Sequence, residues 1–163
     1  MLDETDVQIL DLLQTDARIS NAEIARNVNL APSAVLERVR KLEEKGVIRG
    51  YHTDISPRAV DFGLTAFVAV RTSECSSAEE ALAAVPEVLE VHDVAGEDSY
   101  LLKVRTKDTE DLSRLLREKI KPIPTVVDTR TTIVLQTFKE LATLPLDKCA
   151  ETCRPDRKKS VKA

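Results

Sequence analysis

Apolar side chains recur every three or four residues through the first 45 positions, a spacing typical of amphipathic helices. Asp3 precedes the first such stretch and suits an N-cap. Ser20 precedes the second and has Glu23 three positions later, which is the capping-box pattern. We therefore predict one helix after Asp3 and another after Ser20. Their apolar positions are Val7, Ile9, Leu10, Leu13, Ile24 and Val28.

A third helix is predicted between Pro32 and Gly46, because Pro is favoured in the first turn and Gly ends helices without Cβ strain. Ala31 stands where a capping Ser or Thr is commoner, so we expect a less rigid start. Residues 47–55 follow as a predicted two-stranded ribbon that turns near Gly50. Two helices, a short turn, a third helix and a ribbon predict a winged helix-turn-helix domain.

The third predicted helix has an apolar side and a polar side. At about 100° per residue, Val35, Val39 and Leu42 fall on one stripe. A recognition helix needs short polar groups and cations on its outer side, for base edges and phosphates. An ordinary solvated face carries mixed charges too, but the capped second helix and the ribbon favour DNA contact. The polar side holds Ser33, Glu37, Arg40, Lys41 and Glu44.

Beyond residue 63 the pattern changes to short β-rich runs that alternate with helical ones. The order strand, helix, strand, strand, helix, strand predicts a ferredoxin-like βαββαβ sandwich, so the whole chain is classed as α+β. Both helices of this fold cover one face of the sheet, and we expect a second subunit to cover the other. The predicted elements span residues 65–71, 77–84, 88–95, 100–106, 112–120 and 126–138.

These patterns divide the chain into four parts. We predict a DNA-binding domain at 1–53, a linker at 54–63, a ligand-binding and oligomerisation domain at 64–140, and an extension at 141–163. The last ten of the 163 residues carry +4, so the remainder carries −8 within a net charge of −4. An acidic body adheres poorly to nucleic acid, so any DNA contact must come from a local basic patch.

Composition narrows the possible functions further. Aromatic residues make up 3% of the chain and Trp is absent, which argues against a stacking platform for single-stranded nucleic acid. No apolar run is longer than that at residues 66–70, which is far short of a membrane span of about 20 residues. The acidic N-terminus lacks the basic start of a signal peptide. We therefore expect a cytoplasmic protein that has no membrane partner.

Five segments of the chain resemble the Lrp/AsnC family, the leucine-responsive and asparagine regulators also called feast/famine regulators. The segments are LDETDVQIL at 2–10, EIA at 23–25, VLERVRKLEEKGVIRGY at 35–51, FVAV at 67–70 and AGEDSYLLKV at 95–104. The resemblance implies a transcriptional regulator that binds double-stranded DNA at a pseudo-palindromic operator. It also implies an amino acid or related metabolite as effector, and dimers that assemble into tetramers or octamers.

The resemblance also assigns DNA-binding residues in and after the third helix. Arg38 falls near the apolar stripe, so it is a candidate brace as well as a base reader. Glu37 can accept a hydrogen bond from cytosine or pair with Lys41 four residues later, and we favour the ion pair. Arg49 matches the basic start of the wing. The assigned residues are Ser33, Ala34, Glu37, Arg38, Arg40, Lys41 and Arg49.

The effector site implied by the resemblance lies around the loop between the second and third strands of the second domain. A free amino acid needs a carboxylate for its ammonium group, and a Gly-containing loop also offers backbone N–H groups for its carboxylate. On composition alone the segment is a plain polar turn. Ser99 stands where many members have Asp, which leaves the ammonium partner open. The candidate residues are Gly96, Glu97, Asp98, Ser99, Tyr100, Thr131 and Thr132.

Three rival functions remain to be weighed. Some tetrapyrrole (sirohaem) decarboxylases resemble the same domain pairing, and they would use His52 or His92. A thiol or metal sensor would use Cys149 and Cys153, but two thiols make a poor metal site. A protein that has lost DNA binding would not need the cations of the third helix. We predict no catalytic residue, no metal site and no cofactor.

Overall fold

The computed structural model describes residues 2–73 and 78–146. The described chain divides into two compact units, residues 2–53 with 140–146 and residues 54–139. The residues after 139 group with the N-terminal unit, and the division into four parts stays a prediction. In the part of the chain that is described, no helix is long and apolar enough to cross a bilayer.

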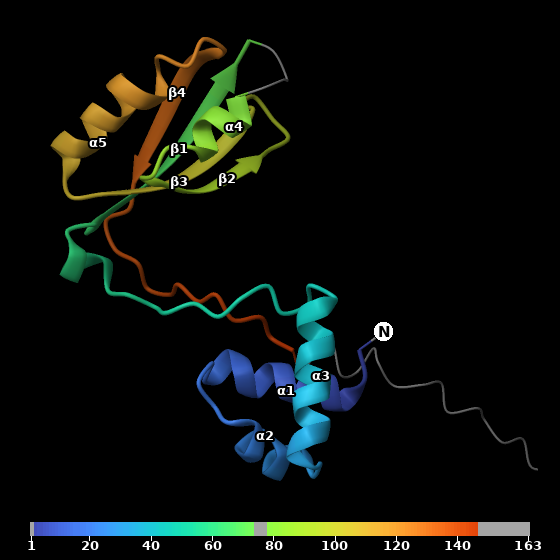
Figure 1. Ribbon diagram of the computed structural model, residues 1–163. Helices are drawn as coiled ribbons and strands as arrows, with labels where there is room; N and C mark the ends of the chain where they lie inside the picture. The colour runs from blue at the N-terminus through green and yellow to red at the C-terminus, as the bar shows by residue number, and fades with distance from the viewer. Residues whose placement is uncertain (1, 74–77, 147–163) are drawn as a thin grey trace, which may run out of the picture. The chain divides into compact units, whose positions relative to one another are not determined.

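Three helices make up the N-terminal unit: α1 (Glu4–Thr15), α2 (Asn21–Val28) and α3 (Pro32–Glu44) (Figure 1). Both predicted N-caps are confirmed, because Asp3 accepts from the Asp6 N–H and Ser20 from the Glu23 N–H. The three helices enclose one small core. Its buried residues are Ile9, Ile24, Ala25, Val35, Val39 and Leu42.

Helix α3 ends as predicted, with Gly46 in the left-handed region at φ +67°. The Val47 and Ile48 N–H groups both donate to the Leu42 carbonyl, at 2.9 and 3.1 Å. The ribbon predicted at 47–55 is wrong, because residues 47–56 form no strand. A run of β-forming residues needs a partner strand to form a sheet. In this segment two of the N–H groups instead donate to a carbonyl at the end of α3.

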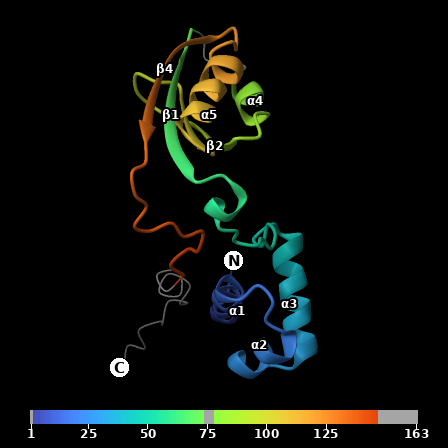
Figure 2. The ribbon, with the colours of Figure 1, turned by 90° about the vertical axis from the view of Figure 1, so that its left-hand side faces the viewer.

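The second unit is a four-stranded antiparallel sheet with two helices on one face (Figure 1, Figure 2). The strand order β2-β3-β1-β4 and the chain order βαββαβ confirm the ferredoxin-like prediction. A short 3₁₀ turn, Pro57–Val60, precedes the sheet, and a π-helical turn, Leu116–Ile120, extends the second helix. The elements are β1 (Leu64–Thr72), α4 (Ala78–Ala83), β2 (Val88–Asp93), β3 (Tyr100–Thr106), α5 (Thr109–Leu115) and β4 (Val126–Ile133).

Alternation along the strands separates a core face from an open face. Along β3 every second residue is buried, so Leu102 and Val104 face the helices while Lys103 and Arg105 face away, as predicted. Val68 of β1 pairs with Leu102 on one side and with Thr131 of β4 on the other. The open face therefore carries Phe67, which is 37% exposed, beside Lys103.

The segment that follows β4 is extended and rich in exposed apolar side chains. Leu135 is 95% exposed and Phe138 is 89% exposed. Further along, Leu144 contacts the N-terminal unit through Gln14 of α1. The Gln14 side-chain amide donates to the Leu144 carbonyl at 3.2 Å, and its oxygen accepts from the Leu144 N–H at 2.7 Å. A side chain thus binds both main-chain groups of one residue.

Candidate DNA-binding surface and effector site

The outer side of α3 presents the predicted cations to solvent. The side chains of Arg40 and Lys41 are 76% and 58% exposed, and Ser33 at the start of the helix is exposed too. The predicted apolar stripe of the same helix is buried against α1 and α2, which fixes the rotation of the helix. The packing therefore points these polar groups away from the core.

Each of the two exposed cations is paired within the helix. Arg40 Nε donates to Glu44 Oε1 at 2.9 Å, and Lys41 Nζ donates to Glu37 Oε1 at 2.8 Å. The second pair confirms the interpretation of Glu37 as an ion-pair partner. The Lys41 ammonium lowers the pKa of the Glu37 carboxyl through this hydrogen bond and its charge. The outer side of α3 thus holds two cations and two anions in i,i+4 pairs.

Arg38 contacts the start of α1, as its position beside the apolar stripe suggested. Its Nη1 lies 2.7 Å from Asp3 Oδ2 and 2.6 Å from Asp6 Oδ1. Those carboxylates also form the capping box of α1. Partial burial opposes the effect, but the Asp6 N–H and the Arg38 guanidinium hold the pKa of Asp3 below its ordinary value. This geometry favours a bracing role for Arg38 over base readout.

The sequence reasoning missed Leu36, which is 56% exposed on α3. At about 100° per residue it lies off the buried stripe and next to Arg40, so the angular pattern alone could have revealed it. An exposed apolar group on a recognition helix suits contact with a thymine methyl.

Ala34 is half-buried, and Arg49 is exposed in the segment after α3. That segment is tied back to α3 by Tyr51, whose hydroxyl donates to Glu43 Oε1 at 3.0 Å.

The loop between β2 and β3 is anchored to β1 by Ser99. The Ser99 hydroxyl accepts from the Thr72 N–H at 3.2 Å and from the Thr72 hydroxyl at 2.8 Å. The Ser99 N–H donates to the Val70 carbonyl at 2.9 Å. Ser99 therefore holds the loop in place through its side chain and its backbone.

The acidic groups of this loop differ in what they contact. Asp98 is ion-paired with Arg130 of β4, and the Asp98 carboxylate raises the pKa of that guanidinium. Glu97 is exposed and has no ion pair or hydrogen bond in the described part of the chain. Tyr100 is 6% exposed and its hydroxyl donates to Glu79 Oε2 at 2.9 Å, so its side chain belongs to the core.

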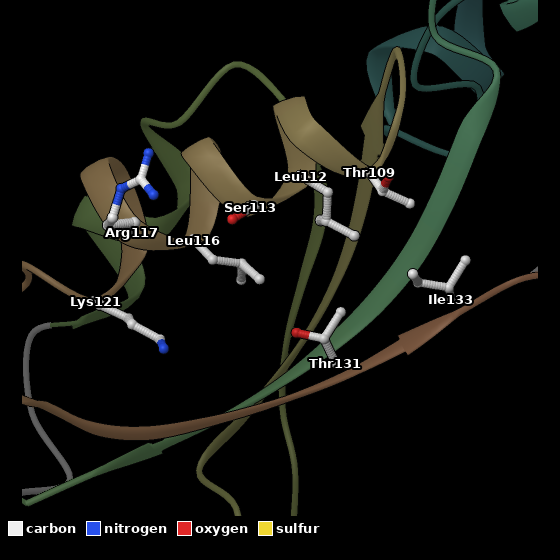
Figure 3. A pocket seen from close by; sticks show the side chains of 8 residues that line it. All are labelled: Thr109, Leu112, Ser113, Leu116, Arg117, Lys121, Thr131 and Ile133. Carbon is white, nitrogen blue, oxygen red and sulfur yellow. The ribbon is translucent and has the colours of Figure 1, made fainter.

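The two threonines predicted to reach one pocket point to opposite faces of β4. Thr131 pairs with Val68 and so shares the helix side of the sheet, whereas Thr132 pairs with Phe67 on the open face. Thr131 lines a groove between α5 and β4, where it faces the side chains of the helix (Figure 3). Strand alternation thus prevents both from contacting one small molecule within this unit.

The histidines on which the decarboxylase alternative depends are surface residues. His92 lies on β2 with its Nε2 3.2 Å from Glu90 Oε2, and His52 is exposed in the segment after α3. Within residues 2–73 and 78–146, no three His, Cys, Asp or Glu side chains gather as a metal site. Cys149 and Cys153, the candidates for a thiol sensor, lie outside the described residues.

Comparison with known proteins identifies both units. Residues 2–49 match the model for winged helix-turn-helix DNA-binding domains, and residues 65–144 match that for the Lrp/AsnC ligand binding domain. The chain is 40% identical over 147 residues to the HTH-type transcriptional regulator FL11 of Pyrococcus horikoshii, covering 89% of this chain and 97% of that protein. It is 38% identical over 144 residues to the leucine-responsive regulatory protein of Escherichia coli, covering 85% and 88%.

Solved structures agree over nearly the same length. A transcriptional regulator from Neisseria meningitidis in complex with L-Met superposes with a TM-score of 0.85 at 33% identity, covering 91% of this chain and 99% of that one. The AsnC protein of Escherichia coli has a TM-score of 0.81 at 29% identity, covering 88% and 98%. A winged helix-turn-helix joined to a ferredoxin-like ligand-binding domain defines a class of DNA-binding transcriptional regulators. Within that class, the chain belongs to the Lrp/AsnC family.

Proposed function

We propose that this protein is a cytoplasmic, non-enzymatic regulator that binds a pseudo-palindromic operator as a dimer and responds to an amino acid. The observation that carries the proposal is the exposed outer side of α3, within a domain matched to winged helix-turn-helix DNA binders. Ser33, Leu36, Arg40 and Lys41 would contact the major groove, and Arg49 the flanking phosphates. The two recognition helices of a dimer would lie ~34–36 Å apart, in successive major grooves.

A homodimer is supported by apolar groups that the single chain leaves exposed. Phe67 on the open face of the sheet is 37% exposed, and Leu135 and Phe138 after β4 are 95% and 89% exposed. Large exposed apolar side chains of this kind are candidates for burial at an interface. We propose that a second subunit covers the sheet face and that dimers assemble further into tetramers or octamers. An effector then acts by shifting this assembly or the spacing of the recognition helices.

For the effector we propose a free amino acid held at the loop 96–99. Glu97 is exposed and makes no described ion pair or hydrogen bond, although its charge acts on Arg130, so it is the proposed partner of the effector ammonium. Asp98 is engaged by Arg130 and acts by shaping the loop. Backbone N–H groups of the loop that begins at Gly96 would donate hydrogen bonds to the effector carboxylate. The L-Met complex of the similar Neisseria protein supports this class of ligand.

DNA binding is tested by Arg40→Ala with fluorescence anisotropy against the DNA upstream of the protein's own gene, using scrambled DNA as competitor. The loss of a charged contact to DNA should weaken specific binding by about tenfold without changing the sedimentation of the protein. Arg114→Ala is the matched control, because Arg114 is also exposed and paired within a helix, with Asp111 at 3.3 Å. Equal affinity in the Arg40 variant and the wild type would contradict the assignment of this helix face.

Effector binding is tested by isothermal titration of the intact protein with a pool of amino acids that is then divided. Glu97→Gln should weaken binding of the active amino acid by about tenfold, because the ammonium loses its charged partner. Glu110→Gln, on the exposed surface of α5, is the control. An unchanged affinity in the Glu97 variant would remove the loop from the site while leaving the DNA result intact.

A further inference from the structure

A groove between α5 and β4 is not used by the function proposed above. It has a volume of about 420 Å³ and is open to solvent along the edge of the sheet, since β4 is an outer strand (Figure 3). Its wall is formed by α5 and the π-helical turn Leu116–Ile120, and such turns occur often at functional sites. The lining residues are Thr109, Leu112, Ser113, Leu116, Arg117, Lys121, Thr131 and Ile133.

Two cations stand at one end of this groove. Figure 3 shows Arg117 and Lys121 at the end of the groove nearest the π-helical turn, with the Lys121 ammonium directed toward the groove and the Arg117 guanidinium directed away from Thr131. The Lys121 ammonium has no ion pair or hydrogen bond in the described chain, and the Arg117 guanidinium contacts Glu118 at 3.5 Å. None of the eight described lining residues is acidic, although acidic residues outnumber basic ones in the chain by 28 to 24. The groove therefore attracts anions.

The rest of the groove is apolar, with two hydroxyl groups midway. Leu112 and Leu116 form the helix wall, and Ile133 on the opposite strand is 41% exposed. The hydroxyls of Ser113 and Thr131 project from the two walls (Figure 3). A matching ligand would have an anionic group at the cationic end of the groove, a hydrogen-bonding group beside the two hydroxyls and an apolar body along the apolar wall.

We propose that the groove binds a monocarboxylate with an apolar body and no ammonium group, of which an aliphatic 2-oxo acid is the best match. Its carboxylate pairs with the Lys121 ammonium, its oxo group accepts from Thr131 or Ser113, and its aliphatic chain covers Ile133. A free amino acid fits poorly, because a desolvated ammonium finds no carboxylate here. The groove is thus a second ligand site, distinct from the loop at Glu97.

The experiment is isothermal titration of the intact protein with two probes, 4-methyl-2-oxopentanoate and L-leucine, which share one side chain. The oxo acid should bind at millimolar concentration or below, and Lys121→Gln should weaken it about tenfold. Lys139→Gln is the matched control, an exposed lysine outside the groove. Glu97→Gln should leave the oxo acid unaffected, which separates this site from the loop, and the titration needs no DNA.

Four results would overturn the proposal: no heat from the oxo acid at millimolar concentration, unchanged binding in the Lys121 variant, equal loss of binding in the Lys139 control, or loss in the Glu97 variant. Sedimentation velocity of the unliganded variants tests the other occupant, a neighbouring subunit lying along β4. If Lys121→Gln changes assembly and not oxo-acid binding, the groove is a subunit contact.

Discussion

At the scale of single residues, the contact of Arg38 with Asp3 and Asp6 has the widest effect on the N-terminal unit. One guanidinium holds both carboxylates of the capping box of α1 and so ties the recognition helix to the first helix of the domain. The orientation of Arg40 and Lys41 therefore depends on a residue that itself points inward. A loss of DNA binding on changing Arg38 would reflect a displaced helix.

Arg38→Gln should lower the free energy of unfolding of the N-terminal unit by about 1 kcal/mol at neutral pH, through loss of two charged hydrogen bonds at a partly exposed site. The pKa of Asp3 is lowered in the folded protein, so the stabilisation is present above its ordinary value of 3.8 and is lost as pH falls through the lowered pKa. Urea unfolding at several pH values should show wild type and variant converging below about pH 4. A constant difference down to pH 2 would contradict this linkage.

How well a residue's contacts could be predicted depended on sequence separation. The pair Glu37–Lys41 followed directly from helix geometry, because residues four apart on a helix must be neighbours. The pair Asp98–Arg130 joins residues 32 apart on a loop and an edge strand, and no local periodicity reports such a contact. The burial of Tyr100 was missed for a similar reason, since its partner Glu79 lies on another element.

At the scale of elements, the helices and strands that were predicted most accurately were those with the most local sequence signals, such as Pro, Gly or strict alternation. Pro32 and Gly46 defined α3 closely, and alternation along residues 100–106 defined β3 with its correct face. The ribbon at 47–55 failed because β-propensity is satisfied only by a partner strand, which a sequence window does not contain. The two threonines of β4 lie on opposite faces of the sheet because adjacent strand residues face opposite ways, and their shared role in effector binding stays a prediction.

Helix α3 begins without a side-chain cap, since Ala31 has the extended backbone of an N-cap, at φ −72° and ψ 145°, and no hydroxyl. Ala31→Ser should raise the free energy of unfolding of the N-terminal unit by about 1 kcal/mol, because its oxygen can accept a free N–H of the first turn. Thermal unfolding followed by circular dichroism measures the gain. Ala31→Val is the control that adds bulk without a cap, and equal stability in both variants would count against the capping explanation.

At the scale of the whole molecule, the chain has two separate hydrophobic cores. Leu102 is fully buried in the core of the sheet unit, and Ile24 is fully buried in the core of the helical unit. The two cores have no buried residue in common. Each unit is therefore stabilised by the packing of its own side chains. In the sequence, helical periodicity gives way to strand alternation beyond residue 63.

Leu102→Ala should lower the free energy of unfolding of the sheet unit by about 2–5 kcal/mol, the usual result of deleting a buried Leu side chain. Hydrogen exchange read by mass spectrometry should show faster exchange in β1 and β3 and unchanged exchange in α1 to α3. Ile24→Ala is the reciprocal control and should affect the helices alone. Faster exchange in both units for either variant would mean that the two cores unfold as one.

The ion pairs of α3 have a consequence for how the regulator finds its operator. Arg40 and Lys41 are each paired with a glutamate, so together they add little net attraction to phosphate. The first 153 residues carry a net charge of −8 and add none. Time spent on random genomic DNA is set by that unspecific attraction. On the proposal that α3 contacts DNA, the protein would leave wrong sequences quickly and would stay long only where base contacts replace the contacts of Arg40 and Lys41 with Glu44 and Glu37. Weak attraction of α3 to random DNA would then shorten the search for the operator.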